Sequence, residues 1–358
     1  MSLSVLFIGG TGIISAACVR EALRLGHDVT VLNRGRTSLR PLPEGVREVQ
    51  ADGRDRDSVT AALGDRSFDA VIDFVAFTPE HVQQDIDVFA GRTGQYVFIS
   101  SASAYQKPPR SVPVTESTPL RNPYWQYSRD KIACEDLLVA EYRASGFPVT
   151  IVRPSHTYDR TALPVDGGWT VVDRMRRGQE VVVLGDGTSL WTLTHADDVA
   201  VGLVGLLGAS AAIGEAFHIT GDETPTWDEI HRCLAAAAGV EPRLVHVASD
   251  AIAAADPELG AGIIGDKAHS MVFDNAKIRR LVPAYSPSVR FSDGAREIVE
   301  WYDADESRRV VDERMNGLFD ALIERYRPRP RGSARCRGSR PARSGRGRAR
   351  LRRPRPTP

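Results

Sequence analysis

Cysteines and long hydrophobic stretches are scarce in this chain. Its four cysteines, Cys18, Cys134, Cys233 and Cys336, are scattered over 358 residues and form no C-x-x-C pair. This pattern argues against a disulfide framework or a cysteine-ligated metal site, and it favours reduced thiols in a cytoplasmic protein. Because no run of about 18 apolar residues occurs, we expect no membrane-spanning helix. The first apolar stretch follows no charged segment and is typical of a strand, so we expect no signal peptide.

Acidic residues are absent from the last part of the chain. Residues 327–358 hold 13 of the 46 basic residues and no Asp or Glu, which leaves 33 basic and 46 acidic residues in 1–326. The segment is rich in Pro, Gly and Ser and has almost no apolar side chains, so we predict a disordered Arg/Pro-rich tail. A nucleic-acid-binding arm is the alternative, although the tail has no aromatic side chain for base stacking. We expect residues 1–326 to form a single domain.

Residues 5–15 combine a short apolar run with a glycine-rich turn. The run 5–8 predicts a buried strand, Gly9 permits a tight turn, and Gly12 lets the backbone approach phosphates where a helix begins. The third glycine of the usual fingerprint is Ser15 here, which is small enough for close helix–strand packing. An ordinary strand–turn–helix is the alternative. The candidate residues for binding a dinucleotide pyrophosphate are Gly9, Thr11, Gly12 and Ile13.

The second predicted strand, 27–32, lacks an acidic residue at its end. It runs into Asn33-Arg34-Gly35-Arg36, where an acid would bind the adenosine ribose of NAD. Without that acid a 2′-phosphate is not repelled, and Arg34 or Arg36 could pair with it. We therefore predict NADP as the cofactor, with NAD as the alternative. Solvated loop arginines would give the same pattern.

The rest of the chain alternates strand-like and helical patterns, with no internal repeat. The strand-like runs are 46–50, 70–75, 96–100, 149–152, 181–184 and 216–219, and the helical patterns are 56–63, 80–90, 124–144, 169–176, 196–207, 227–238 and 293–303. This alternation predicts an α/β fold with a doubly wound parallel sheet, a Rossmann fold, and a smaller carboxyl-terminal lobe mainly from 154–303. Ligands of such sheets bind beyond the carboxyl ends of the strands.

One such strand end carries candidate acid–base residues. Ser101 follows the run 96–100, and Asn122 with Pro123 predicts the start of a helix on which Tyr127 and Lys131 lie one turn apart. An ammonium near a phenol favours the phenolate, so we expect Lys131 to lower the pKa of Tyr127. Such a tyrosine can exchange a proton with a substrate oxygen while a hydride moves at the carbon. The spacing alone arises often by chance.

Together these landmarks resemble the short-chain dehydrogenase/reductase superfamily in its extended or atypical branch, also described as the NAD-dependent epimerase/dehydratase family. The resemblance covers roughly residues 3–303. Its landmarks are Gly9-Gly10-Thr11-Gly12, Asp52, Ser100-Ser101-Ala102-Ser103-Ala104-Tyr105, Tyr127 with Lys131, Arg153-Pro154, Gly185-Asp186-Gly187, the run 195–200, and Glu300-Trp301-Tyr302. The resemblance implies a catalytic triad of Ser101, Tyr127 and Lys131, in which Lys131 also bonds the nicotinamide ribose.

The same resemblance implies further cofactor contacts. Asp52 would approach the adenine amine, the strand end Phe74 to Ala76 would pass beneath the adenosine ribose, and the turn at Pro154 would border the nicotinamide. A loop-capping Asp52 and a merely structural strand end at 74–76 are the alternatives.

Departures from the family pattern narrow the reaction. The Asp-Glu pair of sugar-nucleotide dehydratases is Ala102-Ser103 here, and Trp191 stands near the place of the arginine with which sugar-nucleotide epimerases clamp a diphosphate. A site without these groups lacks an acid for water elimination and a cation for a diphosphate. The changes point toward the atypical branch, which includes chloroplast stem-loop-binding proteins.

Four aromatic residues that follow strand ends, His156, Tyr158, Trp169 and Trp191, are candidates for a substrate pocket or for the packed core. The run His195-Ala196-Asp197-Asp198 has no partner cluster nearby, so we predict a helix cap there and no metal site.

The sequence thus predicts an NAD(P)-dependent oxidoreductase or epimerase that acts on a hydroxyl or carbonyl carbon of a small metabolite. The alternative is a non-catalytic nucleotide-binding or RNA-binding protein of the atypical branch, which would have no need of Ser101, Tyr127 and Lys131. The substrate, the choice between reduction and epimerisation, and the oligomeric state, including a homodimer, stay open.

Overall fold

The structure is a computed structural model that describes residues 2–35 and 39–327. The described residues up to Tyr326 form one compact unit. Two predictions, the phosphate contact of Arg36 and the tail from 328 onward, lie outside the described residues.

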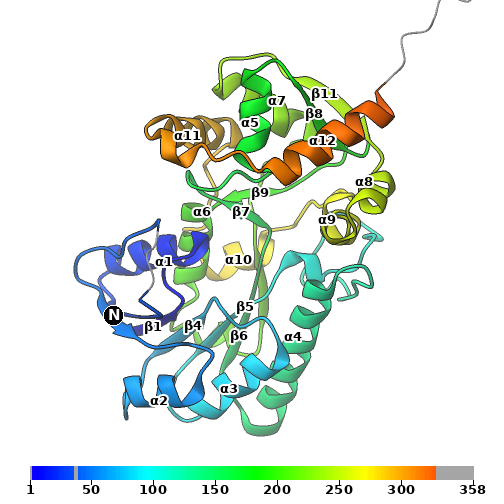
Figure 1. Ribbon diagram of the computed structural model, residues 1–358. Coiled ribbons are helices and arrows are strands. Elements are labelled where there is room, and N and C mark those ends of the chain that lie inside the picture. Colours follow the sequence, from blue (N-terminus) through cyan, green and yellow to red (C-terminus); the bar gives the residue numbers. More distant parts are fainter. Residues whose placement is uncertain (1, 36–38, 328–358) are drawn as a thin grey trace, which may run out of the picture. The chain divides into compact units, whose positions relative to one another are not determined.

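A seven-stranded parallel sheet forms the centre of this unit, in the order β10-β6-β5-β4-β1-β2-β3 (Figure 1). Its strands are β1 (Ser4–Ile8), β2 (Asp28–Asn33), β3 (Arg47–Gln50), β4 (Ala70–Asp73), β5 (Tyr96–Ile99), β6 (Val149–Pro154) and β10 (Ala216–Ile219). The inner strands β4, β5 and β6 are buried along their whole length, as expected for parallel strands covered on both faces. The predicted doubly wound Rossmann-type sheet is confirmed.

Helices cover both faces of the sheet. On one face α1 (Ile13–Arg24), α6 (Ala196–Gly205) and α10 (Ala276–Leu281) share a hydrophobic core with β1, β2, β6 and β10. On the other, α2 (Arg56–Leu63), α3 (Pro79–Phe89) and α4 (Gln126–Ser145) pack on β1, β4, β5 and β6. The two cores hold the strand ends rigidly, which fixes the loops that follow them.

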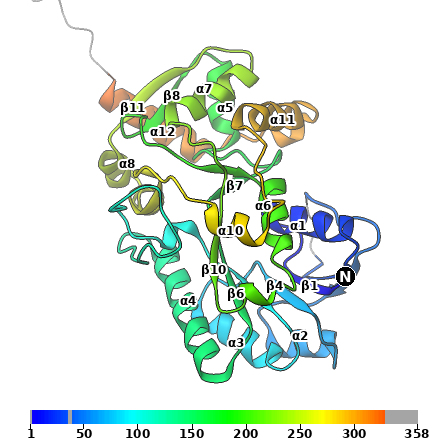
Figure 2. The same cartoon turned by 180° about the vertical axis from the view of Figure 1, so that it is seen from behind.

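A second lobe lies beyond the carboxyl ends of the strands, and Figure 2 shows it from behind. It contains β8 (Glu180–Leu184), which pairs with β11 (Arg243–Val247) outside the central sheet. The pair β7 (His156–Tyr158) and β9 (Leu193–His195) lies between this lobe and the sheet. The helices of the lobe are α5 (Trp169–Arg176), α7 (Trp227–Ala237), α8 (Ser249–Ala255), α9 (Pro257–Gly262), α11 (Phe291–Asp303) and α12 (Glu313–Tyr326).

The predicted start of the fourth helix is wrong. Helix α4 begins at Gln126, with Trp125 as its N-cap residue, so Asn122 and Pro123 lie in the turn before it. The Asn122 side chain is buried and donates to the carbonyl oxygens of Ser103 and Gly265, at 2.8 and 2.6 Å. Its oxygen accepts from the Tyr124 N–H at 3.2 Å, so Asn122 fixes the turn before the helix and does not cap the helix itself. No helix in the described part of the chain is long and apolar enough to cross a membrane.

Candidate active site

A cavity of about 990 Å³ lies where the sheet meets the second lobe. One half, the glycine-turn half, is lined by residues of 8–15, 32–35, 39–40, 51–54 and 74–81. The other, the tryptophan half, is lined by Trp125, 155–157, 191–192 and residues of 266–273. Ser101, Tyr127 and Lys131 line the same cavity. The other predicted residues that line it are Gly9, Thr11, Gly12, Ile13, Asn33, Arg34, Asp52, Phe74 and Pro154.

The glycine turn approaches its neighbours too closely for any side chain. Gly9 has a φ of +82°, and a β-carbon there would lie 2.6 Å from Cγ1 of Val75. The Gly12 N–H donates to Oγ of the buried Ser15 at 2.8 Å, and α1 begins at the next residue. Backbone thus forms the cavity wall at a helix N-terminus, an arrangement that fits the pyrophosphate of a dinucleotide.

The residues after β2 and β3 form the outer part of this half. Oδ1 of Asn33 accepts from the Gly10 N–H at 3.1 Å, so this side chain fastens the glycine turn to the end of β2. Arg34 lines the cavity beside it. Oδ1 of Asp52 accepts from the Arg54 N–H at 3.0 Å, so Asp52 caps its own loop while also lining the cavity.

Arg54 is a cavity residue that the sequence reasoning missed. Its guanidinium pairs with Asp73 and lies 3.5 Å from Oδ1 of Asp85, while its Nε and Nη1 atoms are buried without a partner among the described residues. Burial and the neighbouring Asp73 raise the pKa of Asp85 well above its usual range. Asp73 also accepts from the N–H groups of Val75 and Ala76, at 2.6 and 2.8 Å. This cluster therefore sets the turn that ends β4.

Tyr127 and Ser101 meet at the junction of the two halves. Burial raises the pKa of Tyr127 above its ordinary value, and a hydrogen bond with Ser101 opposes this. The expectation that Lys131 lowers the pKa of Tyr127 is therefore wrong, because desolvation dominates. Ser101 Oγ also lies 2.8 Å from Ser103 Oγ, which fixes the hydroxyl at the start of a short helical turn.

The Lys131 ammonium is buried between backbone oxygens and rings. Nζ donates to the carbonyl oxygens of Ala76 and Ile99, both at 2.7 Å, and lies 4.7 Å from the centre of the Phe77 ring. Burial lowers its pKa to about 8. Ala76, a predicted cofactor residue, is buried and does not line the cavity; it acts on the site through this carbonyl.

The tryptophan half contains only two of the four predicted pocket aromatics. Trp191 Nε1 donates to His156 Nδ1 at 3.1 Å, and both residues line the cavity. Tyr158 instead packs against Phe291 in the core, and Trp169 stacks on Tyr302. Residues that the sequence reasoning missed here are Trp125, Asp266, Lys267, Met271 and Phe273.

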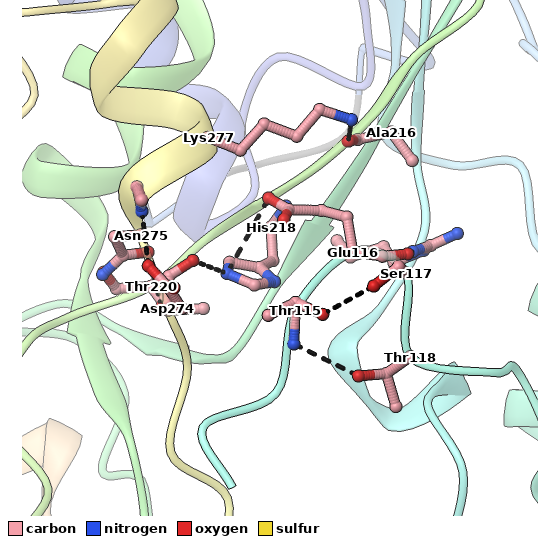
Figure 3. Close-up of polar contacts among 12 residues, drawn as sticks. Thr115, Glu116, Ser117, Thr118, Ala216, His218, Thr220, Asp274, Asn275 and Lys277 are labelled. Carbon is pink, nitrogen blue, oxygen red and sulfur yellow. Dashed lines mark hydrogen bonds and ion pairs between the residues drawn. The ribbon is translucent and has the colours of Figure 1, made fainter. Parts of the chain in front are cut away.

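The far wall of this half is held from behind by buried polar groups (Figure 3). Two backbone hydrogen bonds join Val114 to the segment that forms this wall. In one of them the Asp274 N–H donates to the Val114 oxygen at 2.9 Å. Nε2 of the fully buried His218 donates to the Asp274 carbonyl at 2.7 Å and lies 3.8 Å from Oε1 of Glu116. Its ring packs 5.2 Å from that of Phe273, centre to centre. Burial lowers the pKa of His218, so a neutral imidazole supports the wall.

His195 lies outside this cavity and caps a helix, as predicted. Its Nδ1 accepts from the Asp197 N–H at 3.3 Å, at the N-terminus of α6. No group of three or more His, Cys, Asp or Glu residues arranged to hold a metal ion occurs within 2–35 and 39–327.

Comparison with known proteins identifies relatives of the chain. The model of the family described as "NAD dependent epimerase/dehydratase family" matches residues 5–220. A 2'-dehydrokanamycin reductase of Streptomyces kanamyceticus is 30% identical over 289 residues, which cover 79% of this chain and 80% of that protein. The chloroplast stem-loop binding protein of 41 kDa b of Arabidopsis thaliana is 27% identical over 255 residues, or 68% of this chain and 65% of that protein.

Solved structures agree in fold. Epimerase Mth375 of Methanothermobacter thermautotrophicus has a TM-score of 0.71 at 18% identity, over 86% of this chain and 94% of that one. The NAD complex of a dTDP-glucose 4,6-dehydratase of Bacillus anthracis has a TM-score of 0.68 at 17% identity, over 86% and 98% of the two chains.

Proposed function

The chain belongs to the NAD dependent epimerase/dehydratase family, and from this premise we propose that it is an NADP-linked oxidoreductase. Its reaction is the reduction of a ring carbonyl of a small metabolite, as the name of the relative, 2'-dehydrokanamycin reductase, suggests. The observation that carries the proposal is that Ser101, Tyr127 and Lys131 line one cavity together with the glycine turn and the residues of the tryptophan half.

Tyr127 and Ser101 handle the substrate oxygen in this proposal. Burial keeps the Tyr127 hydroxyl protonated, so the phenol gives its proton to the carbonyl oxygen, while Ser101 donates a hydrogen bond to the same oxygen. A bound nicotinamide supplies the hydride to the neighbouring carbon. Lys131, with its lowered pKa, lies one helical turn away and holds a positive charge beside the reacting groups.

The glycine-turn half supports the assignment of the cofactor. We assign the pyrophosphate to Gly9, Thr11, Gly12 and Ile13 at the start of α1, where the turn lines the cavity and the positive end of the helix dipole favours an anion. Asn33 holds that turn, and Arg34 is assigned to a 2′-phosphate. The remaining assignments are Asp52 to the adenine amine, Phe74 and the strand end at Ala76 to the adenosine ribose, Lys131 to the nicotinamide ribose, and Pro154 to the nicotinamide ring.

Water elimination is a poor fit to the same site. Ala102 and Ser103 occupy the places where sugar-nucleotide dehydratases carry two carboxylic acids, and Ala102 and Ser103 are buried and uncharged. The groups that remain move one proton at one oxygen, which is what carbonyl reduction requires.

The experiment follows a hydride from the cofactor to a product. Purified protein is given NADPH that carries deuterium at the transferable position, together with a set of hydroxylated ring ketones, and the products are examined by mass spectrometry. We expect one deuterium on a newly formed secondary alcohol carbon. Binding of NADPH without transfer to any ketone, or products that have only changed configuration and carry no label, would contradict an oxidoreductase of this kind.

A further inference from the structure

The charges in the tryptophan half are balanced within the protein. Nζ of the buried Lys107 donates to Oδ1 of Asp266 at 2.6 Å, and Nζ of Lys267 lies 2.5 Å from Oδ1 of Asp166. Lys107 and Lys267 thus already face carboxylates. A substrate diphosphate in this half would find neither lysine free to replace its water, a costly transfer for a multiply charged anion.

His156 presents a fixed hydrogen-bond donor to the same space. Its Nδ1 accepts from the Trp191 indole at 3.1 Å, so the neutral ring carries its proton on Nε2. Burial lowers the pKa of His156 to about 4, so the ring stays neutral under ordinary conditions. No described residue accepts a hydrogen bond from Nε2, and His156 lines the cavity. Trp191 is itself stacked on Trp227 with ring centres 5.4 Å apart, which holds the whole arrangement in place.

Asp266 presents an acceptor near the reacting hydroxyl. Only its Oδ1 is engaged, by Lys107, and its side chain is partly exposed to the cavity. It lies near enough to Tyr127 to act on the phenol electrostatically. Trp125, with its ring centre 4.8 Å from that of Tyr127, offers an apolar face between these polar groups. The hydrogen-bond donor, the carboxylate and the aromatic face together suit a ligand that is a hydroxylated or amino-bearing ring.

We propose that the tryptophan half selects a hydroxylated or amino-bearing ring compound that carries no phosphate, with the His156 Nε2–H on a substrate oxygen and the Asp266 carboxylate on a hydroxyl or ammonium. The proposal rests on the oxidoreductase function given above. It assigns specificity to two residues that take no part in hydride or proton transfer. It also separates this chain from relatives whose names specify nucleoside diphosphate sugars.

The first test compares two probes on the full-length protein saturated with NADP. Kanamycin carries several amino and hydroxyl groups and no phosphate, whereas UDP-glucose carries a diphosphate. We expect calorimetry to show a dissociation constant at least about tenfold lower for kanamycin. Equal or tighter binding of UDP-glucose overturns the proposal, and so does the absence of measurable binding of either probe. Failure of NADP itself to bind would instead overturn the proposed function, so the two failures are distinct.

The second test changes the two polar contacts. His156→Phe removes the donor and should weaken kanamycin at least about tenfold, whereas His156→Gln retains an acceptor for Trp191 and a donor for the substrate and should restore most of the affinity. Asp266→Asn should weaken kanamycin and make the effect of added salt on its binding smaller. The affinity for NADP is measured in each variant and should stay unchanged. Kanamycin affinity that is the same in His156→Phe and the unmodified protein would overturn the proposal even if Asp266→Asn failed to fold.

Discussion

The two halves of the cavity are built in different ways. The glycine-turn half is made largely of backbone at the ends of β1, β2, β3 and β4, and its close approaches are set by glycines. The tryptophan half is made of side chains from four separate segments, held together by long-range bonds such as that from Asn122 to Gly265. A site made of backbone tolerates little variation in shape, whereas one made of side chains can change its ligand through a few substitutions. The substrate half of this fold can therefore change by substitution while the glycine turn stays as it is.

The largest expected effect is at the junction of the halves. Tyr127→Phe should reduce turnover by roughly 10²- to 10⁴-fold, because it removes the acid and keeps the ring. The affinities for NADP and for the probes of the tryptophan half should stay near those of the unmodified protein. Tyr124→Phe is the matched control, since Tyr124 is exposed, lies three residues earlier and does not line the cavity. Full activity of Tyr127→Phe would show that the junction does not perform the chemistry.

Lys131 should make stability depend on pH. Burial lowers its pKa from 10.5 to about 8, so between these values the unfolded chain binds more protons than the folded one, and the free energy of unfolding rises with pH. Below pH 8 the cost of the buried charge is fully present. Lys131→Met removes this dependence. The free energy of unfolding of Lys131→Met, relative to that of the unmodified protein, should therefore fall by roughly 3 kcal/mol between pH 8 and 10.5. This figure leaves out the hydrogen bonds that the variant loses. Denaturant unfolding of both proteins across this pH range measures the difference. Plots of unfolding free energy against pH that run parallel for the two proteins would contradict burial of the Lys131 ammonium.

Asn122→Ala should affect one half only. It removes two buried hydrogen bonds and leaves the Ser103 and Gly265 carbonyls without that donor, at a cost of roughly 2–3 kcal/mol in the free energy of unfolding. Because Gly265 adjoins Asp266, the affinity of NADP-saturated protein for kanamycin should fall while the affinity for NADP stays unchanged. An equal loss of affinity for kanamycin and for NADP would contradict the conclusion that the two halves are built in different ways.

Arg34→Ala should affect the other half. We expect the affinity for NADP to fall by roughly 1–3 kcal/mol, through loss of a charge-assisted phosphate contact, while the affinity for NAD changes little. Arg47→Ala is the control, because Arg47 is exposed on the neighbouring strand β3 and does not line the cavity. Equal affinity of the unmodified protein for NADP and NAD would count against this assignment.

The smallest effect is expected from removal of residues 328–358. Their composition offers almost no apolar anchor, so the melting temperature and the affinity for NADP should be unchanged. A decrease of several degrees would show that the segment contacts the rest of the chain. Salt-sensitive RNA binding that disappears with the segment would favour the RNA-binding hypothesis instead.

The sequence predicted the glycine-turn half because its signals are local. Gly9 and Gly12 follow an apolar run directly, and Asn33 closes the next strand, so strand, turn and helix could be placed without long-range information. The helices 56–63 and 169–176 were predicted with the bounds that the structure has, for the same reason.

Beyond His156 and Trp191, the tryptophan half could not be predicted, because its members come together only in three dimensions. Asp266 and Lys267 lie in a π-helical turn, Ile263–Lys267, that has no periodic apolar pattern. Asn122 before a proline is typical of a helix cap, and only the fold shows that the helix starts later and that the Asn122 NH2 group reaches Gly265. The sign of the pKa shift at Tyr127 was likewise hidden, since spacing shows a neighbouring lysine but not the extent of burial.

The position of the 263–273 segment in the chain has a consequence for how the protein is made. The last strand of the sheet in chain order, β10, ends at Ile219, whereas the wall that carries Asp266 and Phe273 follows more than forty residues later. Translation proceeds from the N-terminus, and folded units form as they leave the ribosome. The core on one face of the sheet includes Ile278 and Val282, which follow this wall in the chain, and the residues up to Tyr326 form one compact unit, so we expect the sheet and the substrate wall to fold together.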